Sequence, residues 1–246
     1  MIDDHKIAFH SALSHSLPTA APKKILVIDI GGTHVKALCS GEENHRQFAS
    51  GAMMTAAEMS SQVKKLTADW QYDAVSIGYP GAVMHGKPAS EPRHLGGGWV
   101  GFDFPGAFDC PVTLINDAAM QAMGSYKGGK MLFLGLGTGL GSAMIAAGFV
   151  EPMELGHLPY KKKTYEDYIG KTGKKRLGKK DWEKAVHKIV DILTQGLEPD
   201  DVILGGGNAS KLSNLPAHCR LGSNADAFTG GFRLWQNPGP FQGTSE

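Results

Sequence analysis

Two glycine-containing segments carry residue types that bind phosphate. Asp29-Ile-Gly-Gly-Thr33 closes one apolar run, and Gly137-Thr-Gly-Leu-Gly141 closes another. Glycines after a strand expose backbone N–H groups that can surround phosphate oxygens. A plain hairpin turn is the alternative for the first segment taken alone. Two such turns that face each other would hold a polyphosphate chain from both sides.

Charged and hydroxyl side chains accompany the first glycine segment. Asp29 lies at the end of its strand, where a carboxylate can face a Mg²⁺ ion or the waters of that ion. Thr33 adds a hydroxyl group, and Lys36 could add a positive charge. This segment therefore predicts phosphate binding assisted by Mg²⁺.

The pair Asn116-Asp117 stands where a predicted strand ends and a helix begins. Both residue types favour the N-cap of a helix. A carboxylate at this end of a strand also lies where α/β sheets bind ligands, and it could accept the proton of an attacking hydroxyl. Both roles can hold together. The helix dipole is expected to keep Asp117 ionised, as a base requires.

Three polar residues, Glu154, His157 and Glu166, follow the second glycine segment. Glu154 and His157 could bind either a metal or the hydroxyls of a sugar. Hydroxyl recognition is favoured because no cluster of Cys or His lies near them. A purely structural role is the alternative for His157, and a first-turn acid of a helix is the alternative for Glu166.

Two familiar nucleotide-binding motifs are only partly matched. The stretch 124–130 resembles a Walker A motif, but it ends in Met131 and precedes a strand instead of following one. The stretch 135–141 does not satisfy the G-x-G-x-x-G pattern, and no long helix follows it at once. Neither motif is therefore assigned.

The elements that must position these residues alternate between strands and helices. Apolar runs predict strands at 25–30, 34–39, 73–78, 111–115, 131–136 and 201–204, with a further apolar run at 142–150. Thr55 and Glu58 form a capping box, and apolar residues from Trp182 to Leu193 follow helical spacing. The unit of strand, glycine turn and strand occurs twice, which predicts an α/β protein with two similar lobes and a mixed sheet in each.

Composition and charge exclude several classes of protein. The chain has 246 residues, of which 41% are hydrophobic and 20% charged, with a net charge of +1. These values are ordinary for a soluble globular protein and give no sign of nucleic-acid binding. Three widely spaced cysteines fit a reducing compartment, and no apolar run reaches the roughly 18 residues that span a bilayer. Residues 1–22 do not read as a signal peptide, so we expect a flexible tail and a cytoplasmic location.

The segment from Lys161 to Lys180 is strongly basic. It holds nine basic and two acidic residues, a net charge of +7. A track for a long polyanion is one interpretation, and a solvated helix face is the other.

These segments in this order resemble the ROK family of sugar kinases, within the actin–hexokinase superfamily. The resemblance extends over residues 24–235. It implies a two-lobed actin-like ATPase (ribonuclease H-like) fold with a cleft between the lobes, divided into residues 23–117 and 118–246. The matching stretches are 29–36, 78–81, 114–117, 135–143, 154–157 and 204–208.

The chain departs from the typical family pattern in two places. The cysteine-rich zinc motif that usually follows the stretch at 154–157 is replaced by Lys161-Lys162-Lys163-Thr-Tyr-Glu166, so no zinc site is expected. This replacement and the ending at 219–235 look like the polyphosphate glucokinase branch, whose members accept inorganic polyphosphate and often ATP. The loop His94-Leu-Gly-Gly-Gly-Trp99 lacks the Asn that the family has ahead of Gly-Trp.

The resemblance also implies roles for individual residues, with Asp117 as the catalytic base. It implies sugar contacts at Gly81, Asn116, Asp117, Glu154, His157 and Glu166. It implies phosphate contacts at Asp29, Gly31, Gly32, Thr33, Lys36, Gly137, Thr138 and Gly139. It implies an adenosine or distal-phosphate pocket at Gly205, Gly206, Gly207 and Asn208, and Mg²⁺ near Asp29.

The resulting prediction is a kinase that moves a phosphoryl group from polyphosphate, ATP or both to the 6-hydroxyl of glucose. A homodimer is expected, with no nucleic-acid or membrane partner. A strictly ATP-dependent ROK hexokinase for another hexose, such as mannose, is one alternative. A non-catalytic sugar-sensing ROK module is another, although the short tail leaves no room for a helix-turn-helix and the acidic and glycine segments are intact.

Overall fold

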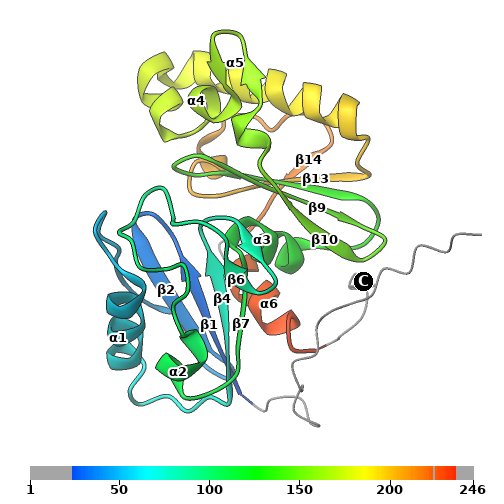
Figure 1. Ribbon diagram of the computed structural model, residues 1–246. Coiled ribbons are helices and arrows are strands. Elements are labelled where there is room, and N and C mark those ends of the chain that lie inside the picture. The colour runs from blue at the N-terminus through cyan, green and yellow to red at the C-terminus, as the bar shows by residue number, and fades with distance from the viewer. Residues whose placement is uncertain (1–23, 224, 237–246) are drawn as a thin grey trace, which may run out of the picture.

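The chain forms two five-stranded mixed sheets, which lie one above the other in Figure 1. The computed structural model describes residues 24–223 and 225–236. The predicted tail at 1–22 lies outside these residues. The predicted α/β architecture with a mixed sheet in each lobe is confirmed.

The first sheet has the strand order β3-β2-β1-β4-β7. Strand β2 pairs antiparallel with β1 and β3, whereas β4 runs parallel to β1 and β7. Strands β1 and β4 are buried along nearly their whole length, as central strands with both faces covered must be. The bounds are β1 Ile25–Ile30, β2 His34–Cys39, β3 Arg46–Ala49, β4 Ala74–Tyr79 and β7 Val112–Asn116.

The second sheet, β10-β9-β8-β13-β14, repeats this pattern of two antiparallel pairs followed by two parallel pairs. The duplication predicted from the glycine turns is therefore present in the topology. The apolar run at 142–150 is divided between two strands, because Ala147 (φ 51°) and Gly148 (φ 79°) form a turn. The bounds are β8 Met131–Leu136, β9 Leu140–Ala146, β10 Phe149–Met153, β13 Asp201–Gly205 and β14 Cys219–Leu221.

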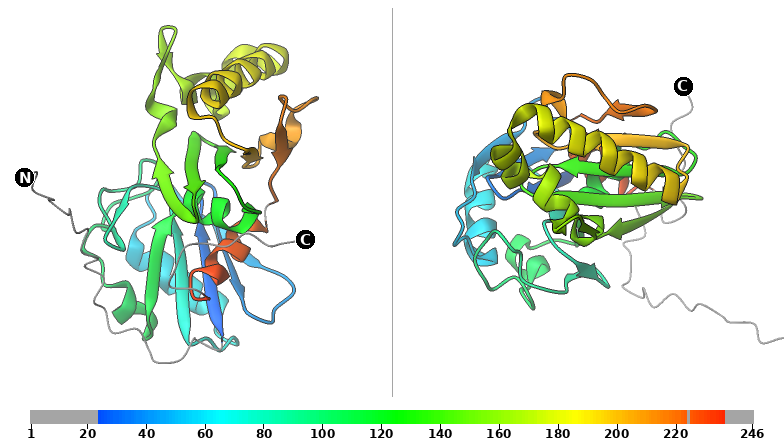
Figure 2. Two further views of the ribbon diagram at one scale, coloured as in Figure 1. Left: turned by 90° about the vertical axis from the view of Figure 1, so that its right-hand side faces the viewer. Right: turned by 90° about the horizontal axis from the view of Figure 1, so that it is seen from above.

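The helices follow the capping and spacing signals of the sequence. Thr55 caps α1 by accepting from the amide of Glu58 (3.2 Å), and the Glu58 carboxylate accepts from the amide of Thr55 (2.9 Å). The apolar stripe of α5 from Trp182 to Leu193 is buried against the second sheet, which α5 covers in Figure 2. In the described ranges, no helix combines the length and apolar character needed to cross a bilayer. The helices are α1 Ala56–Leu66, α2 Phe104–Phe108, α3 Asp117–Ser125, α4 Tyr165–Ile169, α5 Lys171–Leu197 (interrupted at Gly178) and α6 Asp226–Arg233.

Short elements complete the connections. A hairpin of β5 and β6 precedes the long loop before α2, and a hairpin of β11 and β12 precedes α4. The bounds are β5 Val83–Met84, β6 Lys87–Pro88, β11 Pro159–Tyr160 and β12 Lys163–Thr164, with 3₁₀ turns at Leu155–His157 and Ala209–Lys211.

Helices α3 and α6 join the two sheets. α3 packs its alanines against the second sheet, whereas α6 packs on β1 beside Ile25 and Val27. The buried Ser76 of β4 donates to the carbonyl of Gly231 (2.6 Å) and accepts from Nε1 of Trp235 (2.8 Å). The C-terminal helix therefore covers the first sheet, although the strands that precede it in the chain belong to the second. The division of the chain after residue 117 stays a prediction.

The contact between α3 and α6 requires glycine, which gives a stability prediction. A Cβ on Gly124 would lie 1.8 Å from the carbonyl oxygen of Asp226, and one on Gly230 would lie 1.8 Å from that of Met120. Gly124→Ala should therefore lower the free energy of unfolding by about 2–3 kcal/mol in urea titrations, because the helices must move apart.

Gly196→Ala is the matched control. Gly196 also lies within a helix, α5, but a Cβ there would meet nothing within 4 Å. This substitution should raise the free energy of unfolding by about 0.5–1 kcal/mol, because alanine favours the helix. Equal effects of the two substitutions would contradict the close contact of α3 and α6.

Candidate active site

The carboxyl ends of the parallel strands bring Asp29 and Asp117 to one edge of the first sheet. Asp29 of β1 pairs in register with Gly78 of β4, and Gly78 pairs with Ile115 of β7. Asp117 follows two residues later. Gly78 permits this approach, because a Cβ there would lie 2.3 Å from Cε of Met120 and 3.5 Å from Cα of Asp117. The two carboxylates are close enough for the charge of Asp29 to raise the pKa of Asp117.

Asn116 rather than Asp117 is the N-cap of α3. Its Oδ1 accepts from the amide of Ala119 (3.1 Å), and its Nδ2 donates to the carbonyl of Gly81 (3.1 Å). Asp117 is the first residue of the helix, and its Oδ1 accepts from the amide of Ala118 (2.8 Å). These bonds fix the orientation of both side chains and bring Gly81 beside them.

The electrostatic surroundings of Asp117 differ from the expectation. Its pKa is raised to about 7, first by burial and then by the negative charges of Asp29 and Glu154, while the hydrogen bond from Ala118 opposes the shift. Burial and the neighbouring negative charges thus act against the ionised form that the start of the helix was expected to favour. A carboxylate with a pKa near neutrality is well matched to general base catalysis at neutral pH.

The two predicted glycine turns face each other. A Cβ on Gly32 in the first turn would lie 3.7 Å from Oγ1 of Thr138 in the second. The amide of Gly31 closes the first turn by donating to the carbonyl of His34 (3.0 Å), and Gly32 and Thr33 are exposed beyond it. The arrangement can therefore contact one phosphate chain with backbone groups from both lobes.

The segment 205–208 lies directly against the second glycine turn. Asn208 donates from Nδ2 to the carbonyl of Gly137 (3.2 Å) and from its amide to the carbonyl of Leu136 (2.9 Å). Gly206 has φ 78°, and a Cβ there would lie 2.8 Å from the carbonyl carbon of Leu136, so a larger residue does not fit. On another side, the amide of Lys171 donates to the carbonyl of Gly137 (3.1 Å).

Glu154, His157 and Glu166 form a polar cluster beside the same turn. The ring of His157 lies between the carboxylates, with Nδ1 3.6 Å from Glu154 and Nε2 4.0 Å from Glu166. Oε2 of Glu166 would lie 2.6 Å from a Cβ on Gly139, so glycine lets Glu166 reach over the turn. Carboxylate and imidazole groups in this order can accept from and donate to neighbouring hydroxyls of a sugar.

These contacts join the predicted residues into one set. Most residues of the set either contact another member or shift the pKa of another member. The remaining residues lie in the same short segment as one that does. The set comprises Asp29, Gly31, Gly32, Thr33, Lys36, Gly81, Asn116, Asp117, Gly137, Thr138, Gly139, Glu154, His157, Glu166, Gly205, Gly206, Gly207 and Asn208.

The acidic residues offer Mg²⁺ a carboxylate rather than a complete cage. Among the described residues, no group of three or more His, Cys, Asp or Glu side chains is placed to hold a metal. The carboxylate of Asp29 nevertheless fits Mg²⁺, since this ion commonly binds one or two carboxylates together with substrate phosphates and water. Burial raises the pKa of Asp29, and Lys36, its register partner on β2, lowers it in part.

Two residues beside the set were not predicted. Arg93 donates to Oε1 of Glu166 (3.2 Å), and Nζ of Lys211 donates to Oδ1 of Asn208 (3.1 Å). Spacing gives no signal for the first contact, because the two residues are 73 positions apart. The one available hint was that Arg93 directly precedes the loop that starts at His94.

Lysines from two segments gather near Asn208. Burial lowers the pKa of Lys174 on α5, and the positive charges of Lys211 and Lys179 lower it further. Nζ of Lys174 also lies 4.5 Å from the ring centroid of Trp182. This concentration of positive charge lies next to Asn208, which contacts the second glycine turn, and it can attract a polyanion.

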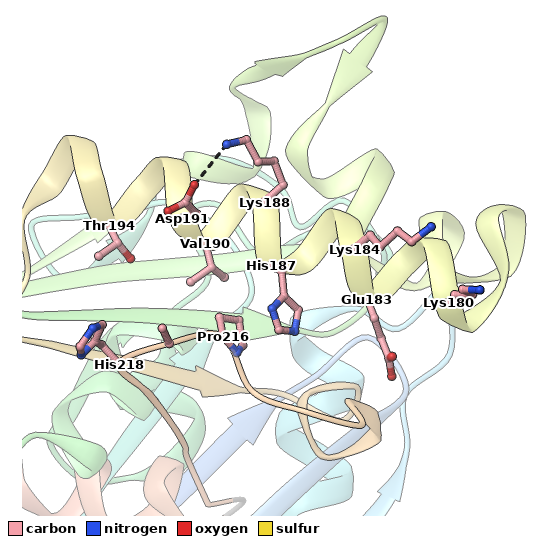
Figure 3. A pocket seen from close by; sticks show the side chains of 11 residues that line it. Lys180, Glu183, Lys184, His187, Lys188, Val190, Asp191, Thr194, Pro216 and His218 are labelled. Carbon is pink, nitrogen blue, oxygen red and sulfur yellow. Dashed lines mark hydrogen bonds and ion pairs between the residues drawn. The ribbon is translucent and has the colours of Figure 1, made fainter.

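A groove of about 730 Å³ lies elsewhere, on the side of α5 shown in Figure 3. His187 of α5 points toward Pro216 in the loop before β14, whereas Lys188 points away from that loop and is paired with Asp191 (3.1 Å). None of the residues predicted for the site lines this groove, so it is not assigned to the reaction.

Curated relatives match part of the chain. The polyphosphate glucokinase of Mycobacterium leprae is 30% identical over 152 residues, which cover 56% of this chain and 47% of that protein. The bifunctional enzyme NanE/NanK of Brucella melitensis is 30% identical over 157 residues, which cover 57% of this chain and 29% of that protein. The chain thus spans less than half the length of these two relatives. No family model matches it.

Solved structures share the fold over nearly the whole chain. The inorganic polyphosphate/ATP-glucomannokinase of Arthrobacter sp. strain KM superposes with a TM-score of 0.75 at 23% identity, over 88% of this chain and 99% of that one. A ROK family glucokinase of Streptomyces griseus, solved with glucose and AMPPNP, gives 0.65 at 18% identity, over 87% and 99%. The chain is thus similar in part of its sequence to polyphosphate glucokinases, and it has the fold of the ROK glucokinase structure. The resemblance and the actin-like fold predicted from the sequence are confirmed.

The raised pKa of Asp117 predicts a pH-dependent stability. An aspartate in the unfolded chain has a pKa near 4, whereas the pKa of folded Asp117 is about 7. The stability contributed by the protonated carboxyl is therefore complete below pH ~4 and is lost as the pH rises through about 7. Asp117→Asn should exceed the wild type in free energy of unfolding at pH ~8 by about 1–2 kcal/mol, allowing for solvent screening, and should match it at pH ~4.

Asp69→Asn is the control of opposite sign. The ion pair with Arg46 lowers the pKa of Asp69 to about 2, so its charge stabilises the fold above the unfolded pKa. This variant should be less stable than the wild type by a nearly constant amount above pH ~5, and the difference should close as the pH falls from ~4 toward 2. Urea titrations from pH ~2 to 8 measure both effects. A difference between Asp117→Asn and wild type that does not change with pH would contradict the shifted pKa.

Proposed function

We propose that the chain is a ROK-type phosphotransferase that moves a phosphoryl group from inorganic polyphosphate, ATP or both to the 6-hydroxyl of glucose. The observation that carries this proposal is the carboxylate of Asp117. It has a pKa of about 7 and is fixed at the sheet edge beside a polar Glu–His–Glu cluster. The site thus offers a base, groups for sugar hydroxyls and backbone groups for phosphates in one place.

Asp117 accepts the proton of the 6-hydroxyl as that oxygen bonds to the terminal phosphorus of the donor. The bond from this phosphorus to its bridging oxygen breaks, and the shortened polyphosphate or ADP leaves with the electron pair. Glu154, His157 and Glu166 hold the other sugar hydroxyls, so that the attacking oxygen stays in line with the phosphorus. Asn116 and Gly81 support the same sugar from the first lobe.

The donor lies between the two glycine turns. Residues 31–33 of the first lobe and 137–139 of the second bind its phosphate oxygens, and Lys36 adds positive charge. The segment 205–208 receives either the distal phosphates or an adenosine group. Bound Mg²⁺ at Asp29 would supply further positive charge to the transferring phosphoryl group.

The relatives support both the sugar and the donor. The Mycobacterium leprae protein is a polyphosphate glucokinase, and the Arthrobacter protein is a polyphosphate/ATP-glucomannokinase. Assays that combine glucose or mannose with polyphosphate or ATP, in the presence of Mg²⁺, test the proposal. We expect sugar 6-phosphate from glucose, and from mannose if the site tolerates the epimer. A protein that phosphorylates neither sugar with either donor would overturn the kinase proposal.

A homodimer and a cytoplasmic location stay predictions.

Removing the proposed base should abolish turnover with little loss of sugar binding. Asp117→Asn keeps the shape and the acceptor for the Ala118 amide but not the basicity, so kcat should fall roughly 10²- to 10⁴-fold. In the wild type, kcat/KM should rise with pH and level off above about pH 7, because the base must be ionised. A coupled assay for glucose 6-phosphate measures both quantities.

Asp103→Asn is a matched control in the same lobe. Asp103 caps α2 by accepting from the amide of Gly106 (3.0 Å), and asparagine caps helices equally well. This variant should keep normal turnover. Near-normal kcat in Asp117→Asn would show that another group takes the proton.

The lysines near Asn208, which are Lys174 and Lys179 of α5 and Lys211, should affect the binding of polyphosphate more than that of ATP. Lys174→Gln with Lys179→Gln should raise the KM for long-chain polyphosphate roughly three- to tenfold at low salt, with a smaller change in the KM for ATP. The wild-type KM for polyphosphate should also rise more steeply with salt than the KM for ATP, because a long polyanion displaces more counterions.

Lys65→Gln with Lys87→Gln removes two exposed lysines of the other lobe and so matches the change in net charge. It should leave both KM values unchanged. Equal responses of the two donors to the paired substitution and to salt would rule out a polyphosphate track on α5.

A further inference from the structure

The loop between β6 and α2 reaches from the first lobe toward the second. Its two ends are fixed on their own lobe. Oη of Tyr79 donates to the carbonyl of Ser90 (2.7 Å), and the carboxylate of Glu91 accepts from the amides of Trp99 (3.1 Å) and Val100 (3.2 Å). Trp99 is fully buried. Arg93 and His94 therefore lie in a short span between two anchored ends.

This span touches both halves of the site. A Cβ on Gly32 would lie 3.6 Å from Cβ of His94, which puts the loop against the first glycine turn. Arg93 extends to the other lobe, where Nη1 donates to Oε1 of Glu166 on α4 (3.2 Å). The ion pair between Arg93 and Glu166 is thus a direct connection between the lobes at the site.

The surroundings of Glu166 leave its carboxylate few positions. Oε1, the oxygen that Arg93 holds, is also 4.0 Å from Nε2 of His157. Oε2 is directed at Gly139, where a Cβ would lie only 2.6 Å away. The side chain of Glu166 is 28% exposed, against 63% for Arg93. Two of these contacts come from the second lobe, and only Arg93 comes from the first.

The charges of the site also favour a role for Arg93. Asp29, Asp117, Glu154 and Glu166 all contribute negative charge to a place that must admit a polyanionic donor. The guanidinium of Arg93 offsets the carboxylate nearest the second glycine turn. It also fixes which oxygen of Glu166 remains turned toward His157, and the hydroxyl contacts of a carboxylate depend on that orientation.

We propose that Arg93 is a positioning residue for sugar binding, which holds Glu166 in its sugar-binding orientation from across the two lobes. The inference rests on the proposed function, in that Glu166 is taken as a sugar ligand. Arg93 itself acts through Glu166 and does not touch the reacting atoms.

The test compares Arg93→Ala, Arg93→Lys, Glu166→Gln and the double variant Arg93→Ala/Glu166→Gln. Arg93→Ala should raise the KM for glucose about three- to tenfold, the effect of losing one partly exposed charged contact, while kcat and the KM for the donor stay within about twofold. Arg93→Lys should recover part of the loss, because an ammonium can make the single bond. In the Glu166→Gln background, removing Arg93 should add little, because its partner is already neutral.

Lys87→Ala is the matched control, since it removes an exposed cation from the same lobe just before the loop. It should leave the KM for glucose unchanged. Calorimetric titration of glucose in the absence of donor separates the two proposals. A wild type that neither binds nor phosphorylates sugar defeats the proposed function itself. An active wild type whose Arg93→Ala variant binds glucose normally, or loses sugar and donor affinity alike, overturns the role of Arg93 alone.

Discussion

The burial of two carboxyl groups at one sheet edge is the constraint on which the site depends, because it raises the pKa of both Asp29 and Asp117. Parallel pairing of β1, β4 and β7 brings Asp29 and Asp117 together, and Gly78 lets α3 begin close to the strands. The backbone of both residues is fixed, because Asp29 belongs to a central strand and Asp117 is the first residue of a capped helix. The fold therefore holds both acids where loss of hydration disfavours the ionised form, and the charge of Asp29 adds to this effect at Asp117. This is a common price of reactivity in a preorganised site.

The duplicated sheets divide the chemistry between them. Both copies supply a glycine turn after the first strand, but an acid accompanies only the first copy, at Asp29. The second copy instead supports its turn with Asn208 and with the start of α5. The first lobe thus carries the buried acids Asp29 and Asp117, and the second carries the cluster of Glu154, His157 and Glu166 together with the lysines of α5. Arg93, on the loop between β6 and α2 of the first lobe, pairs with Glu166 of the second.

Features that depend on neighbours in the sequence were predictable, and those that depend on distant contacts were not. The strands, the capping box of Thr55 and the buried stripe of α5 follow from local spacing. The sign of the Asp117 shift was missed because the helix dipole is a local effect, whereas burial and the charge of Asp29 arise only in the folded sheet. Arg93 was missed for the same reason, because it meets Glu166 through the tertiary fold. Lys211 is only three residues from Asn208, so local spacing alone could have found that contact.

The return of α6 to the first sheet has a consequence for how the molecule is made. A Cβ on Gly231 would lie 2.3 Å from Cγ1 of Val27, so the helix presses directly on the strand that carries Asp29. During translation, that face of the sheet stays bare until α6 has left the ribosome. The first sheet therefore completes its packing only after the strands of the second have been made, and until then it exposes apolar surface that favours aggregation.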